Sequence, residues 1–155
     1  TSRRQRIHKV KWEGIAMMWK EKYRVGADLI DTQHKELFHR VSNFIQTVQS
    51  PQPWEAKVEK VKETMAFMQD YVVVHFNDEE RFQEKIGYPE LERHRDIHAR
   101  FREGVQGYVD RAAKEGFTEE LIQEFGGKLM AWLIMHVAAE DQKIGAFLRS
   151  QGRQL

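Results

Sequence analysis

The sequence contains no cysteine, and its apolar runs are short, such as the one from Ile15 to Trp19 and the longest, of seven residues, from Leu129 to Met135. The missing thiols exclude disulfide bonds, iron–sulfur clusters, thiolate-bound zinc and a cysteine nucleophile. A helix needs roughly 20 apolar residues to cross a bilayer, so no transmembrane span is expected. No secretory signal is recognisable, and we therefore expect a cytoplasmic protein.

An excess of charge of one sign is also lacking, because 25 basic residues nearly balance 24 acidic ones and leave a formal net charge of +1. No global field therefore favours nucleic acid or an anionic membrane as a partner. The hydrophobic content of 41% and charged content of 32% are typical of a globular chain that buries a core. The chain opens with a basic segment. We expect residues 1–18 to be a tail or linker and residues 19–155 to be a single domain.

Apolar residues recur at helical spacing in four long segments, and no strand-like alternation of useful length interrupts them. Asp31 and Thr118 are N-cap candidates, Pro53 suits the first turn of a helix, and Gly116 follows the end of one. The expected helices span residues 31–49, 53–85, 89–115 and 118–149. Four long helices with short connections predict an all-α fold, an antiparallel up-down-up-down four-helix bundle with an N-terminal lead-in segment.

Two pairs of side chains that can bind metal have the spacing of one helical turn. His75 and Glu79 are four residues apart in the second helix, and His94 and His98 are four apart in the third. Four residues turn an α-helix through about 400°, so the members of each pair project from one face. Both pairs can therefore reach one small inorganic centre, although a His–Glu pair at this spacing is also common as a simple side-chain contact.

The fourth helix carries a less regular pair, His136 and Asp141, which are five residues apart. On an ideal helix this spacing leaves them about 140° apart, so they can share a metal only through long reach or a local distortion. His34 stands alone near the start of the first helix, whereas His8 and His39 fall outside the pattern and are expected at the surface. Every predicted helix thus contributes a candidate ligand. Nitrogen and oxygen donors without sulfur suit iron, manganese, zinc or copper.

The motifs around these residues resemble those of the hemerythrins, particularly the bacterial ones. The resemblance covers roughly residues 19–148, which is nearly the whole chain beyond the tail. It rests on Val25-Gly26 followed by Ile30-Asp31-Thr32-Gln33-His34, on His75-Phe76-Asn77-Asp78-Glu79-Glu80, on Gly87-Tyr88-Pro89 leading to His94, His98 and Phe101, and on Trp132-Leu133-Ile134-Met135-His136 running on to Asp141.

The resemblance implies a non-heme di-iron centre with seven protein ligands, and none of the seven positions is missing. They are His34, His75, Glu79, His94, His98, His136 and Asp141. By analogy with the family, one iron takes three histidines and the other takes two. We expect His75, His94 and His98 to bind the first iron, and His34 and His136 to bind the second. The two carboxylates would bridge the irons.

The same resemblance implies reversible binding of molecular oxygen, for carriage, storage or buffering, with no catalytic residues. The cofactor would be two iron ions bridged by a solvent-derived oxo or hydroxo group. Five imidazoles, two bridging carboxylates and that oxygen provide eleven bonds, whereas two octahedral ions need twelve. One position therefore stays open on the iron with two histidines, and oxygen is expected there. Residues 19–155 would form this hemerythrin-like oxygen-binding domain.

Four bulky apolar residues lie beside the candidate ligands in the sequence, and we expect them to form a dry wall around the oxygen pocket. They are Phe76, Trp132, Leu133 and Val137. Ordinary core packing is the alternative explanation for these residues, and both can hold.

Other functions remain open beside oxygen carriage. The chain begins at Thr1 rather than at methionine and has a basic lead-in, so it can be a trimmed chain or a fragment of a longer protein. An oxygen- or redox-sensing domain, with a fused or partner signalling domain, is therefore the main alternative. A peroxidase or iron oxidase and a structural zinc bundle are further alternatives. We expect that the chain is not an enzyme, and that molecular oxygen is its partner rather than nucleic acid or a membrane.

Overall fold

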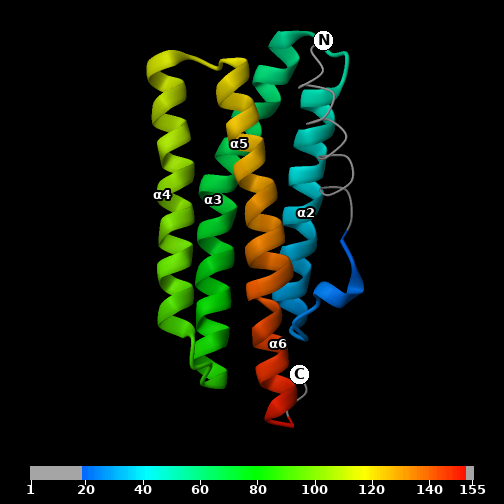
Figure 1. Ribbon diagram of the computed structural model, residues 1–155, viewed down its shortest axis with the longest axis vertical. Helices are drawn as coiled ribbons and strands as arrows, with labels where there is room; N and C mark the ends of the chain where they lie inside the picture. The colour runs from blue at the N-terminus through cyan, green and yellow to red at the C-terminus, as the bar shows by residue number, and fades with distance from the viewer. Residues whose placement is uncertain (1–18, 153–155) are drawn as a thin grey trace.

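The described part of the chain, residues 19–152 of a computed structural model, is built from helices joined by short connections (Figure 1). The expected tail over residues 1–18, with His8, lies outside the described residues. The elements are η1 (Glu21–Tyr23), α2 (Asp28–Gln49), α3 (Trp54–Ile86), α4 (Leu91–Glu115), α5 (Glu119–Trp132), η2 (Leu133–Glu140) and α6 (Gln142–Ser150). Among the described residues, no helix combines the length and the apolar character that crossing a bilayer requires.

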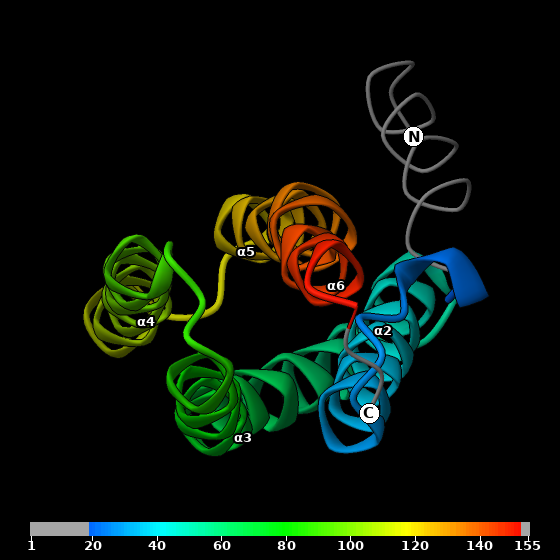
Figure 2. The ribbon, with the colours of Figure 1, turned by 90° about the horizontal axis from the view of Figure 1, so that it is seen from below.

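Four rods run up and down beside one another and surround a common interior (Figures 1 and 2). Helices α2, α3 and α4 form three of them, and α5, η2 and α6 follow one another as the fourth. Neighbouring rods pack together around the ring, α2 on α3, α3 on α4, α4 on α5, and α5 back on α2. The predicted antiparallel four-helix bundle is confirmed.

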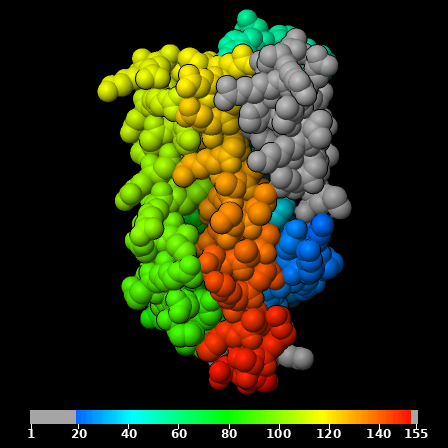
Figure 3. Space-filling model, in the orientation of Figure 1, coloured from blue at the N-terminus to red at the C-terminus, as the bar shows by residue number. Residues whose placement is uncertain are grey.

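The lead-in before α2 is held by the carboxylate of Asp31, a residue that the sequence suggested as a helix N-cap. Asp31 is not an N-cap, because α2 already begins at Asp28. Its carboxylate instead accepts hydrogen bonds from the backbone N–H groups of Val25, at 2.7 Å, and Gly26, at 3.2 Å. Residues 19–27, blue in Figure 3, lie against the orange and red fourth rod, and the side-chain amide of Gln142 donates to the backbone oxygen of Tyr23.

The other helix ends lie within about two residues of their predicted positions. Thr118 is an N-cap, as predicted, because its hydroxyl oxygen accepts a hydrogen bond from the backbone N–H of Leu121 at 3.1 Å. Pro53 is the N-cap of α3 rather than its first residue, and α4 begins two residues after Pro89. Gly87 ends α3 in the left-handed conformation, with φ of 71°, which glycine adopts without steric cost.

The apolar core consists of one main cluster and two smaller ones, and the candidate ligands lie between them. The main apolar cluster starts at Leu37 on α2 and ends at Phe76 on α3, whereas two smaller clusters lie beyond His34 and Glu79 on the same helices. The fourth rod repeats this order, because Val137 belongs to the main cluster and Ile144 to a small one. In α2, α3 and the fourth rod, the candidate ligands therefore lie in a layer with apolar side chains on both sides of it.

Candidate metal centre

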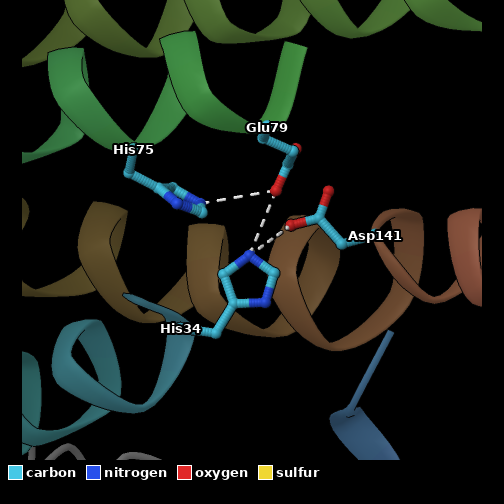
Figure 4. Close-up of side chains that lie close together, drawn as sticks. All are labelled: His34, His75, Glu79 and Asp141. Atoms are coloured by element: carbon cyan, nitrogen blue, oxygen red, sulfur yellow. Dashed lines mark hydrogen bonds and ion pairs between the residues drawn. The ribbon is translucent and has the colours of Figure 1, made fainter. Parts of the chain in front are cut away.

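The structure gathers all seven side chains that sequence analysis singled out as ligands. They are His34 from α2, His75 and Glu79 from α3, His94 and His98 from α4, His136 from η2, and Asp141, which follows η2. His136 is 3% exposed and the other six are fully inaccessible. Figure 4 shows four of them, His34, His75, Glu79 and Asp141, pointing toward one another across three rods. Seven ionisable or metal-ligating groups thus share one closed interior site.

Local helix geometry explains how each rod presents its ligands. His75 with Glu79, and His94 with His98, are one α-helical turn apart and project from one face, as predicted. His136 and Asp141 lie at the two ends of a π-helical turn, and the backbone N–H of Asp141 donates to the backbone oxygen of His136 at 2.8 Å. A π-helical bond joins residues five apart, so these two side chains come to lie on one face. This is the local distortion that their spacing required.

Each oxygen of Glu79 faces a different group of histidines. Oε2 lies 3.2 Å from Nε2 of His34 and 3.4 Å from Nε2 of His75. Oε1 lies 3.2 Å from Nε2 of His98 and 3.9 Å from Nε2 of His136. The carboxylate therefore lies between two sets of imidazoles and faces both.

The two carboxylate oxygens of Asp141 also face different sets of histidines. Its Oδ2 lies 3.1 Å from Nε2 of His34, whereas its Oδ1 lies 3.2 Å from Nε2 of His136 and 4.0 Å from Nε2 of His94. Two carboxylates that each turn one oxygen to either side have the arrangement of ligands that bridge a pair of cations.

The expected division of the histidines between two metal ions is wrong in one respect. His75 was grouped with His94 and His98, but its ring lies beside that of His34, with centroids 4.7 Å apart. The ring of His136, which was paired with His34, instead lies 5.2 Å from that of His94 and 5.0 Å from that of His98. The structure therefore separates a two-histidine set, His34 and His75, from a three-histidine set, His94, His98 and His136.

The outward ring nitrogens of two histidines are bonded to acceptors that sequence analysis gave no role. Nδ1 of His75 lies 2.7 Å from Oε1 of Gln33, whose amide N–H in turn donates to Asp78 at 2.8 Å. Nδ1 of His98 lies 2.8 Å from Oε2 of Glu80. An acceptor at Nδ1 fixes the proton there and leaves Nε2 free as a ligand. Gln33 and Glu80 are adjacent in sequence to ligands, which was the one available signal.

Gln83 is a third residue that sequence analysis missed. It lies four residues after Glu79, so its amide N–H reaches Oε1 of Glu79 at 3.4 Å, and the same amide is hydrogen-bonded to Nδ1 of His94. Gln83 is fully buried. A glutamine one turn beyond a ligand, on the same helix face, could have been noticed from the spacing alone.

Burial and proton sharing strongly perturb the pKa values of the seven groups. Burial lowers the pKa of His34, but its close contacts with the carboxylates of Asp141 and Glu79 outweigh this and raise it to about 10. For His98, burial is likewise outweighed by hydrogen bonds with Glu79 and Glu80, and its pKa is raised to about 9. Burial lowers the pKa of His136 to about 3. Without a bound metal ion, protons on His34 and His98 therefore supply positive charge beside the buried carboxylates.

The donor atoms of the cluster fit bound cations. Among the residues the structure describes, Nε2 of His75, Nε2 of His94 and both oxygens of Asp141 are buried without a hydrogen bond of acceptable geometry. Buried polar atoms in native proteins almost always have a partner, so this group of atoms needs one. Overlapping sets of three or four of these residues place one donor atom each within 4.8 Å of one another. Nitrogen and oxygen donors of this kind suit iron and related transition metals.

The four predicted pocket residues are all buried beside the cluster. Phe76 stacks on the ring of His98 with centroids 3.8 Å apart, and Trp132 lies nearly parallel to the ring of His136 at 5.8 Å. Leu133 and Val137 are at most 1% exposed and belong to the main apolar cluster. The two aromatic rings thus cover two members of the three-histidine set, His98 and His136.

A surface groove of about 410 Å³ approaches the cluster. Trp132 and His136 line its inner part, and Met135, which is 69% exposed, lies at its margin. The groove therefore brings solvent close to the one ligand that is not fully inaccessible.

Comparisons with known proteins agree with this site. The family model described as "Hemerythrin HHE cation binding domain" matches residues 25–148. A bacteriohemerythrin of Stenotrophomonas maltophilia is 29% identical over 126 residues, which are 81% of this chain and 77% of the relative. A bacteriohemerythrin of Clostridium acetobutylicum is 24% identical over 81% of this chain and 96% of its own length. One of Campylobacter jejuni is 29% identical over 76% of this chain and 84% of its own length.

Proposed function

Because this chain belongs to the hemerythrin family, we propose that it binds molecular oxygen reversibly at two iron ions held by the seven buried side chains. The family supports an iron-dependent, oxygen-binding kind of function, and the chain holds a buried cluster of histidines and carboxylates that can bind metal. The observation that carries the proposal is the division of both carboxylates between two sets of histidines.

In this proposal the two metal ions are bound unequally. His34 and His75 would hold one ion, the other three histidines would hold its neighbour, and Glu79 and Asp141, which each face both sets, would be shared between the two. The ion with two histidines has one fewer protein ligand, so oxygen is proposed to bind on the side of α2 and α3. When bound, a pair of ferrous ions supplies the electrons and the vacant coordination position for reversible oxygen uptake.

The surrounding side chains keep water away from this chemistry. Phe76 contacts the rings of both His75 and His98, and so covers the boundary between the two histidine sets. Leu133 and Val137 add fully buried aliphatic surface without a proton donor. A dry, apolar wall slows protonation and escape of a charged reduced product, which favours release of oxygen itself over turnover. We therefore propose a binding protein rather than an enzyme.

Oxygen or redox sensing is the second candidate function, and one contact chain favours it. Glu80 accepts from His98 and also lies 3.5 Å from Nε of Arg95, whose side chain is 42% exposed. A change at the centre therefore has a route to the surface of α4 through one hydrogen bond and one ion pair. The two candidate functions differ in the expected rate of oxidation of the reduced centre. A sensor needs fast and lasting oxidation, whereas a carrier must resist it.

Gas uptake by iron-loaded protein tests the proposal. Reduced protein should contain two irons per chain and take up one oxygen molecule for each pair, most of it recovered on evacuation. The variant His75→Ala should reduce the iron content, while His39→Ala, outside the cluster, should change neither number. A chain that holds one iron, or oxygen that cannot be recovered, would refute reversible binding at a di-iron centre.

A further inference from the structure

His98 is held between two consecutive glutamates of α3. Its inward nitrogen, Nε2, lies 3.2 Å from Oε1 of Glu79, and its outward nitrogen, Nδ1, lies 2.8 Å from Oε2 of Glu80. Glu79 is fully buried, whereas the side chain of Glu80 is 18% exposed and faces Arg95. Glu80 therefore does not face the metal cluster itself but contacts it through one imidazole.

This contact is different in kind from those of the other histidines. Nδ1 of His75 meets the neutral amide oxygen of Gln33. Nδ1 of His94 instead meets the amide nitrogen of Gln83, while the Nδ1 atoms of His34 and His136 have no hydrogen-bond partner among the described residues. Within that part of the chain, His98 alone has a carboxylate within hydrogen-bonding distance of its outward nitrogen, because the nearest carboxylate oxygen to Nδ1 of His94, Oε1 of Glu79, lies 3.7 Å away. The three-histidine set therefore has an anionic partner that the two-histidine set lacks.

We propose that Glu80 is a positioning residue that makes His98 the most strongly electron-donating histidine of the centre, and that it thereby tightens the three-histidine metal site and favours its oxidised form. The proposal rests on the proposed function only in requiring that the cluster binds metal. It assigns a role to a residue that is not itself a ligand.

The physical basis is the charge of the acceptor. A carboxylate that accepts the Nδ1–H pulls the proton toward itself, and this raises the basicity of Nε2 at the opposite side of the ring. A more basic ligand stabilises the more highly charged metal ion, so the reduction potential of the site falls. The effect is preserved because the imidazole is fully buried, where water does not screen the interaction.

The test replaces the charge of Glu80 without changing its shape. Glu80→Gln keeps an oxygen that can accept from His98 but removes the negative charge. The matched control is Glu84→Gln, one turn further along α3, because Glu84 is 70% exposed and also contacts Arg95, at 3.9 Å, and no interaction with His98 is found for it. Both variants lose the same charge near the same arginine, and only one loses it at the imidazole.

Two measurements read the effect. Competition with a chelator gives the Co²⁺ affinity of the metal-free protein. We expect Glu80→Gln to weaken the tighter site by about 10-fold or more, as is usual when such a partner is lost. Redox titration of the iron-loaded protein should show a positive shift, and a tenfold change in the equilibrium corresponds to about 59 mV for one electron. Glu84→Gln should match the wild type in both.

A second variant reverses the sign and does not disturb the buried side of the contact. Arg95→Gln removes the cation beside Glu80, so the carboxylate should bind the imidazole proton more strongly and the potential should become more negative. Equal potentials in the wild type, Glu80→Gln and Arg95→Gln would overturn the proposal. If the wild type takes up no oxygen, the proposed function fails, but the Co²⁺ comparison still decides whether Glu80 acts on the metal site.

Discussion

Removal of the metal should destabilise this protein strongly, because the centre can be assembled only by the folded chain. The seven side chains proposed as its ligands come from all four rods. In the unfolded chain, only the pairs His75 with Glu79, His94 with His98, and His136 with Asp141 remain close in sequence, and two donors bind weakly. Metal binding is therefore largely coupled to folding, and its free energy should appear as stability of the native state.

The size of the effect follows from linkage. A ligand at 1,000 times its dissociation constant stabilises the folded state by about 4.1 kcal/mol, so two sites contribute about 8 kcal/mol. For a chain of this length, each kcal/mol raises the melting temperature by about 2–4 °C. We therefore expect metal-saturated protein to melt roughly 16–32 °C above the metal-free protein.

Circular dichroism at increasing temperature measures this directly, with the helical signal followed at a series of free Co²⁺ concentrations. Each tenfold increase should add about 1.4 kcal/mol per site, so once both sites bind the melting temperature should rise by about 6–11 °C. A difference below about 5 °C between metal-free and saturated protein, or a melting temperature independent of free metal, would refute this reasoning. The cluster would then be a proton-sharing polar network rather than a metal site.

Two further predictions concern pH and packing. Metal must displace protons from His34, with its pKa at about 10, and from His98, at about 9, so the apparent metal affinity should rise with pH up to about 10. The stability of the metal-free protein should change in the opposite direction, because a raised pKa stabilises the fold below the unfolded value of about 6.5 and this contribution is lost as pH rises through 9 to 10. Titration calorimetry in buffers of different ionisation enthalpy, and thermal unfolding with a chelator, would detect both trends, and a pH-independent affinity would contradict them. Phe76→Ala should cost about 3–5 kcal/mol, because the ring is fully buried against His98. It should also speed oxidation of the reduced protein, whereas Trp54→Ala, at a 43% exposed residue, should change stability by about 0.5 kcal/mol or less, and chemical denaturation with stopped-flow oxidation would measure both.

The bundle and two of the ligand pairs follow from local spacing, which a sequence displays directly, whereas the full set of seven side chains came from the resemblance to the hemerythrins. Pairs such as His94 and His98 share a face in any α-helix, and apolar periodicity defines each rod. The start of α2 could not be found in the same way, because Asp31 uses its carboxylate on the backbone of the lead-in rather than as a helix cap. That choice depends on tertiary contacts, since η1 packs on the fourth rod.

The division of the histidines into two sets could not be predicted from spacing, because it depends on which rods face each other across the layer. His75 and His98 both lie near Glu79, but they meet opposite oxygens of that carboxylate. The π-helical turn before Asp141 was required by spacing but could not be located without the backbone. The outward partners of the ligands were missed because their side chains approach from a neighbouring helix, as that of Glu80 does.

The central claim is tested most directly by one optical experiment on the iron-loaded protein. The protein is reduced with dithionite, freed of the reductant, exposed to oxygen and then returned to an oxygen-free atmosphere. Reversible binding at a di-iron centre predicts charge-transfer absorption in the near ultraviolet and visible range that appears with oxygen and disappears when oxygen is removed. Immediate conversion to a ferric spectrum that removal of oxygen does not reverse would contradict carriage, and sensing would then be the better account of the site.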